Sequence, residues 1–204
     1  MINNYSVLRK VISKELCDFL YEYLKIRRQG LEIMLGNRLI SPFVDYWGSM
    51  GDGQVPDTFN CYGDPAMDCL LPKLKSTMEK ETNLTLVENY TYARLYKNGD
   101  VLKRHKDRFS CEISTTLYLG GTPWPIYLDP TGKEDQEGTR VDLGIGDMLI
   151  YKGEKLEHWR YPLHGQDCAQ VFLHYNNIER ENATQNRFDG RECLGIPNCL
   201  KRKK

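Results

Sequence analysis

The sequence predicts an α+β protein that is mostly β, in which packing helices precede an antiparallel sandwich or barrel. Two segments before about residue 83 have apolar residues at helical spacing, and the period changes to two from about residue 84. Short strand-like runs separated by turn residues then continue to about residue 178. We expect one domain over residues 1–204, with a helical part at 1–83, a β core at about 84–178 and a polar tail at 179–204.

Two helices are expected in the first part of the chain. Ser13 is positioned to cap the first helix, whose apolar stripe consists of Leu16, Phe19, Leu20, Tyr23 and Leu24. The second helix is expected to begin with Asp64 as its N-cap and Pro65 at its first helical position. Pro72 should kink or divide this second helix, because proline lacks the backbone N–H that the helix interior requires.

The segment between these helices, residues 36–63, is rich in glycine, aspartate, proline and aromatic residues, which predicts a long irregular loop. Loops of this length inside a compact domain often serve as lids over functional sites. Trp47 lies in this segment, and exposing an aromatic side chain without a partner is costly. We therefore expect Trp47 to belong to a lid.

The β core is expected to begin where Tyr90, Tyr92, Arg94 and Tyr96 alternate with smaller or apolar residues. Asn98-Gly99-Asp100 then forms a strong turn signal. Further strands are expected at 112–119, 125–128, 139–143, 147–151, 156–160 and 168–175. No helical pattern separates these runs, so an antiparallel arrangement is favoured over a parallel sheet with crossover helices.

The bulk composition excludes several classes of partner. The 28 basic and 28 acidic side chains cancel, so no global field favours nucleic acid or an anionic membrane. No stretch approaches the ~20 consecutive apolar residues that a membrane helix needs. We expect a soluble, cytoplasmic protein. Its seven cysteines lack paired CxxC spacing, which argues against a zinc ribbon and favours reduced thiols.

A candidate metal motif lies between the first core strands. His105 and Asp107 are two residues apart, so an extended chain projects both side chains to the same side. His158, which follows a turn and an apolar strand at 146–151, would complete a set of two histidines and one carboxylate. His164 and His174 are weaker candidates. By itself, the charged run around His105 could equally be a solvated surface segment or a phosphate-binding patch.

Four segments carry a resemblance to a known family: YARLYKNGD at 92–100, HKD at 105–107, GDMLIY at 146–151 and HWRYPL at 158–163. Over residues 85–176 the sequence resembles the 2-oxoglutarate- and iron(II)-dependent oxygenases, particularly the branch similar to prolyl 4-hydroxylases. The resemblance implies a double-stranded β-helix, that is, a cupin-like jelly-roll. It also implies that His105, Asp107 and His158 bind Fe(II), with 2-oxoglutarate and O2 as co-substrates and ascorbate as a further candidate.

The sequence departs from this family at one position that matters. Family members usually carry Arg or Lys about ten residues after the second histidine, to pair with the far carboxylate of 2-oxoglutarate, whereas this chain has Cys168. Arg160 is our first candidate for the missing anchor, since an extended chain places it on the same side as His158. Arg94 is the second, with the Tyr92 hydroxyl beside it. Two neutral residues of the last predicted strand, Gln170 and His174, are further candidates.

The function expected on this basis is hydroxylation of a C–H bond, with succinate and CO2 as co-products. The substrate is unidentified, and a peptide, an amino acid or a small metabolite all fit. A basic group formed by Lys103, Arg104, Lys106 and Arg108 around the motif would suit an anionic substrate. Two other classes stay open: a non-catalytic β-barrel binding module, and an iron oxygenase that does not use 2-oxoglutarate. The sequence indicates no oligomeric state.

Overall fold

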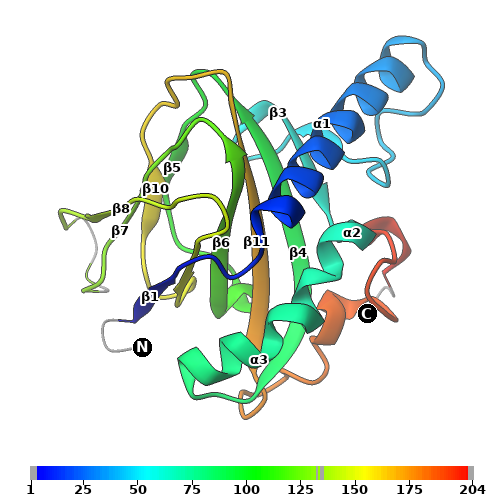
Figure 1. Cartoon of the computed structure of the whole chain (residues 1–204). Helices are drawn as coiled ribbons and strands as arrows, with labels where there is room; N and C mark the ends of the chain where they lie inside the picture. Colours follow the sequence, from blue (N-terminus) through cyan, green and yellow to red (C-terminus); the bar gives the residue numbers. More distant parts are fainter. Residues whose placement is uncertain (1–3, 132, 134–135, 202–204) are drawn as a thin grey trace.

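Two antiparallel sheets form the core of the computed structural model, which describes residues 4–131, 133 and 136–201 (Figure 1). The larger sheet has the strand order β1 (Tyr5–Leu8), β9 (Met148–Tyr151), β6 (Ile113–Gly121), β11 (Asp167–Asn177), β4 (Leu86–Lys97), β3 (Pro56–Tyr62) and β2 (Ser49–Gly51). The smaller sheet has the order β5 (Leu102–His105), β10 (His158–Arg160), β7 (Ile126–Leu128) and β8 (Thr139–Val141). The predicted fold class, mostly β with a jelly-roll arrangement, is confirmed.

The helices pack on one face of the larger sheet (Figure 1). They are α1 (Lys14–Gly36), α2 (Pro65–Asp68) and α3 (Leu70–Thr82), accompanied by the short 3₁₀ turns η1 (Phe109–Cys111), η2 (Arg187–Gly190) and η3 (Asn198–Leu200). Ser13 caps α1 as predicted, accepting a hydrogen bond from the Leu16 backbone N–H at 3.2 Å. None of the helices in the described part of the chain is long and apolar enough to cross a membrane.

The alternation along β4 separates two environments. Ala93 and Leu95 belong to the apolar cluster between the larger sheet and the helices. Tyr92, Arg94 and Tyr96 point to the opposite side, where they line a cavity. Because successive residues of a strand face opposite sides of a sheet, the period of two in this segment determines which side chains reach the cavity.

The N-terminal part is less helical than predicted. Residues 1–83 contain β1, β2 and β3 in addition to the helices, and the predicted irregular loop at 36–63 includes two of these strands. Strand β3 forms because it pairs with β4, for example Asn60 opposite Arg94, and such pairing is invisible to local periodicity. The second predicted helix is divided at Cys69, which leaves Pro72 in the first turn of α3 where its missing N–H costs little.

Candidate metal centre

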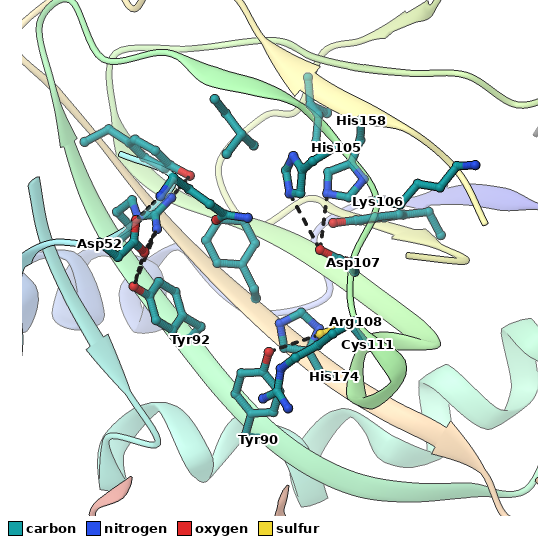
Figure 2. A pocket seen from close by; sticks show the side chains of 17 residues that line it. Asp52, Tyr90, Tyr92, His105, Lys106, Asp107, Arg108, Cys111, His158 and His174 are labelled. Atoms are coloured by element: carbon teal, nitrogen blue, oxygen red, sulfur yellow. Dashed lines mark hydrogen bonds and ion pairs between the residues drawn. The ribbon is translucent and has the colours of Figure 1, made fainter. Parts of the chain in front are cut away.

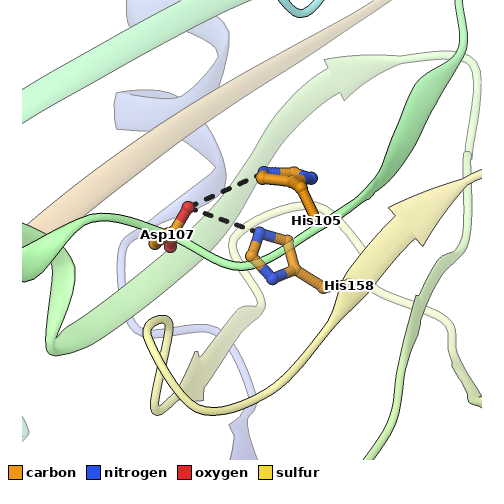
Figure 3. Close-up of side chains that lie close together, drawn as sticks. All are labelled: His105, Asp107 and His158. Carbon is orange, nitrogen blue, oxygen red and sulfur yellow. Dashed lines mark ion pairs between the residues drawn. The ribbon is translucent and has the colours of Figure 1, made fainter. Parts of the chain in front are cut away.

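The structure brings the three predicted metal ligands together (Figure 3). His105 ends β5 and His158 begins β10, and the two residues lie directly opposite each other in the antiparallel pair. Oδ1 of Asp107 lies 3.7 Å from Nε2 of His105 and 3.6 Å from Nε2 of His158. The three ligand atoms lie within 4.8 Å of one another, so one ion can contact all three.

Backbone carbonyls orient both imidazole rings. Nδ1 of His105 lies 2.7 Å from the Lys103 carbonyl oxygen, and Nδ1 of His158 lies 3.0 Å from that of Leu156. A ring N–H at Nδ1 that donates to a carbonyl leaves the lone pair on Nε2, which faces Asp107. Both histidines are therefore held in the tautomer that binds a metal through Nε2.

The Asp107 carboxylate is fixed and charged. Burial alone would raise its pKa, but His158, His174 and His105 together outweigh burial and hold the pKa of the Asp107 carboxyl well below its usual range. Oδ2 accepts a hydrogen bond from the Ser114 hydroxyl at 2.9 Å. A Cβ added at Gly153 would lie 2.4 Å from that same Oδ2, so the close approach of this backbone requires glycine.

A cavity of about 340 Å³ opens beside this centre (Figure 2). Its wall contains the three candidate ligands, several aromatic residues of the larger sheet, and the basic residues Arg94, Lys106 and Arg108. Arg108 also forms a two-point ion pair with Asp189, at 3.0 and 2.7 Å. Figure 2 shows Asp52 and Tyr92 at one side of this cavity and the candidate metal ligands at the other.

Arg94 reaches the cavity but already has a carboxylate partner. Its side chain is 2% exposed and forms an ion pair with Asp52, which lies in the turn between β2 and β3. The Tyr92 hydroxyl donates to the same Asp52 oxygen at 2.6 Å, and Nη1 of Arg94 donates to the Tyr96 hydroxyl at 3.3 Å. The guanidinium charge is thus neutralised within the chain.

Arg160 is equally buried and has no such partner. It is 1% exposed, and among the described residues no carboxylate pairs with it. Its guanidinium donates to the Trp124 carbonyl and, at 3.3 Å, to the Thr116 hydroxyl. Its Nε is buried without a hydrogen-bond partner, and burial lowers the pKa of the Arg160 guanidinium. A buried cation without a counter-charge is costly unless a ligand supplies one.

Arg160 does not itself line the cavity, but it acts electrostatically on groups that do. Cys168, Tyr96 and Tyr151 are the neighbours that offset the lowering of its pKa, and the two tyrosines belong to the cavity wall. The guanidinium therefore lies near position 168, where the family resemblance implies a basic residue.

Gln170, a further candidate anchor, already has hydrogen-bond partners. It donates to Cys168 Sγ at 3.2 Å and accepts from the Thr116 hydroxyl at 3.1 Å.

Several expectations about individual residues are changed by the structure. Trp47 does not line the cavity, and its ring lies against the Arg27 guanidinium instead, so the prediction that Trp47 belongs to a lid is wrong. Asp52 and Gln54 of the same segment do line the cavity. His164 is exposed and apart from the site. Asp52 and Cys111 also line the cavity, and neither belongs to a local sequence motif that would have predicted it as a site residue.

Comparisons with known proteins agree with this fold. Sequence comparison finds no matching family model and no matching curated protein. Among solved structures, a prolyl-4-hydroxylase from Pseudomonas putida is 16% identical, with a TM-score of 0.60 over 85% of this chain and 92% of that chain. AviO1 from Streptomyces viridochromogenes is 14% identical, with a TM-score of 0.63 over 88% and 92% of the two chains. HygX from Streptomyces hygroscopicus, solved with nickel and 2-oxoglutarate, is 13% identical, with a TM-score of 0.59 over 86% and 84%. The chain therefore has the fold of the 2-oxoglutarate- and iron(II)-dependent oxygenases, including those that resemble prolyl 4-hydroxylases.

Proposed function

We propose that this protein is an Fe(II)- and 2-oxoglutarate-dependent dioxygenase that hydroxylates a C–H bond, with succinate and CO2 as co-products. The observation that carries the proposal is the convergence of His105, Asp107 and His158 on one point at the wall of a cavity. Two imidazoles and one carboxylate are the donor set of non-haem iron oxygenases and leave coordination positions open for a co-substrate and oxygen. The donor set therefore fits Fe(II).

The chain's own residues prepare this centre. The Lys103 and Leu156 carbonyls hold the two imidazoles with Nε2 inward, and Ser114 holds the carboxylate. When bound, iron and 2-oxoglutarate together supply the activation of oxygen, which no amino-acid side chain provides. The apolar and aromatic part of the wall, including Phe172 and Ile126, limits access of water to the reacting atoms.

Arg160 is the proposed anchor for the far carboxylate of 2-oxoglutarate. It is a buried guanidinium without a carboxylate partner among the described residues, so a dicarboxylate would supply the missing charge. With a divalent ion, the Asp107 carboxylate, a dianionic co-substrate and Arg160, the charges of the complex cancel. Arg94 with Tyr92 is the second candidate, and it is disfavoured because Asp52 already neutralises Arg94.

Succinate formation tests the proposal. Purified protein is incubated with Fe(II), 2-oxoglutarate, ascorbate and O2 but without a further substrate, because uncoupled turnover consumes 2-oxoglutarate slowly. We expect succinate from the wild type and none above background from His105→Ala or Asp107→Ala. If the wild type forms no succinate, and anaerobic addition of Fe(II) and 2-oxoglutarate produces no charge-transfer absorbance, the proposed function is wrong. Oxygen consumption without succinate would favour an iron oxygenase that uses another co-substrate, and metal binding without either would favour a binding module.

The substrate class stays a proposal that covers peptides, amino acids and small metabolites. The similar structures include a prolyl-4-hydroxylase and HygX, which has also been solved with hygromycin B. A prolyl group and hygromycin B differ in kind, so the shared fold does not select a substrate class. Lys106 and Arg108 line the cavity, but Asp189 already pairs with Arg108, so the charge of the wall does not select a substrate class either.

A further inference from the structure

A second group of metal-binding side chains lies on the same cavity wall. Asp107, Cys111 and His174 each offer a ligand atom within 4.8 Å of the others. Cys111 belongs to η1 and His174 to β11, so the two residues are distant in sequence and are brought together by the fold. Figure 2 shows both side chains near Asp107, on the side away from His105 and His158. Neither Cys111 nor His174 is needed for the iron centre proposed above.

The two oxygens of Asp107 face different neighbours. Oδ1 is the atom close to His105 and His158. Oδ2 accepts from the Ser114 hydroxyl, and the same hydroxyl oxygen lies 3.0 Å from Nδ1 of His174. A carboxylate with its oxygens directed to two donor sets can serve either set.

Packing holds the other two ligands in place. The Tyr90 hydroxyl lies 3.1 Å from Cys111 Sγ, and the Tyr90 ring lies against the His174 imidazole with ring centroids 4.5 Å apart. Tyr90 is itself stacked on Tyr62 at 4.8 Å. Cys111 is 3% exposed and His174 6% exposed, yet both line the cavity and are within reach of a small ion that enters it. The ligands are therefore preorganised rather than mobile.

We propose that Asp107, Cys111 and His174 form a second metal site, selective for a thiophilic divalent ion such as Zn(II). Sulfur and imidazole donors favour zinc, whereas the neighbouring set of two imidazoles and a carboxylate suits Fe(II). Binding breaks the Cys111 S–H bond and forms a sulfur–metal bond, and the proton is released to solvent. A dication with one carboxylate and one thiolate is neutral overall, which suits a site this deeply buried.

Sharing Asp107 couples this site to the iron centre. An ion held by Cys111 and His174 draws on the carboxylate that the iron centre needs, and it lies in the cavity where the co-substrate would bind. Zn(II) is therefore expected to weaken Fe(II) binding through Asp107. The second site remains testable if the proposed oxygenase function fails, because its metal binding requires neither 2-oxoglutarate nor O2.

Cobalt(II) substitution tests the proposal, since a cysteine ligand to Co(II) produces a sulfur-to-metal charge-transfer band in the near ultraviolet. The exposed Cys69, Cys193 and Cys199 are first replaced by serine, so that surface thiols cannot contribute to this band. In this background we expect the band on adding Co(II), and we expect it to persist in His105→Ala, which damages only the iron centre. Cys111→Ser should abolish the band, and Asp107→Asn should weaken it.

Zn(II) affinity provides a second measurement that does not depend on the spectrum. Losing an outer partner of a metal ligand already costs about 10–100-fold in affinity, so Cys111→Ser or His174→Ala should weaken Zn(II) binding by at least about tenfold in competition with a chelator. Far-ultraviolet circular dichroism checks that each variant is folded. The proposal is overturned if the background protein shows no charge-transfer band, or if folded Cys111→Ser keeps both the band and the Zn(II) affinity.

Discussion

Arg94 and Arg160 are both buried near the cavity, but their surroundings differ in one respect. Arg94 is paired with Asp52, which the turn between β2 and β3 brings to it. Among the described residues Arg160 donates to a carbonyl and a hydroxyl but pairs with no carboxylate, and the Nε of each arginine is buried without a partner. A buried charge is tolerated when a counter-charge is near. The fold itself thus supplies the counter-charge of Arg94, and the missing counter-charge of Arg160 supports the proposal that a ligand supplies it.

The largest expected effect is on co-substrate binding by Arg160→Gln. Truncating one partner of a buried, hydrogen-bonded charge pair costs about 2–5 kcal/mol, so we expect the Kd for 2-oxoglutarate to rise by about 30-fold or more. Anaerobic titration of the Fe(II) protein with 2-oxoglutarate measures this Kd. Arg94→Gln is the matched control and should change it much less. The opposite ranking of the two variants would exchange the roles assigned to these arginines.

The second expected effect concerns stability and Asp52. Asp52→Ala leaves the Arg94 guanidinium buried without a counter-charge, and we expect the free energy of unfolding to fall by about 1–3 kcal/mol. Urea denaturation of the metal-free protein measures it. Asp52→Asn is the matched variant, because it keeps an oxygen for the backbone N–H groups of Gln54 and Val55 and removes only the charge. Equal stability of the wild type, Asp52→Ala and Asp52→Asn would show that the Arg94–Asp52 ion pair contributes nothing to the free energy of unfolding.

The smallest expected effect is the pH dependence of the stability that the Arg94–Asp52 ion pair contributes. Burial would raise the pKa of the Asp52 carboxyl, but Arg94 and the other hydrogen-bond donors outweigh burial and lower it from 3.8. A depressed folded-state pKa contributes stability that is fully present above the unfolded-state value and is lost as the pH falls through the folded-state pKa. The stability difference between the wild type and Asp52→Asn should therefore be constant near neutral pH and shrink below about pH 4. A difference that grows on acidification would contradict this assignment of the Asp52 charge.

The sequence by itself determined the features that depend on neighbouring residues. The spacing of His105 and Asp107 identified them as a pair, because side chains two apart on an extended chain share a side. The alternation along β4 identified Tyr92, Arg94 and Tyr96 as one face, and Ser13 marked the start of α1. Each of these inferences rests on backbone geometry over a few residues, which local sequence specifies directly.

Only the tertiary structure decided which distant residues meet. Segment 36–63 contains strands because β3 has β4 to pair with, and this pairing brings Asp52 to Arg94. Cys111 and His174 meet Asp107 because η1 and β11 converge on the same wall. Sheet register and burial set these contacts, and both are properties of the whole packed chain rather than of any short segment. For the same reason the sequence could propose Arg160 and Arg94 as anchors, but it could not tell which of them already has a carboxylate partner.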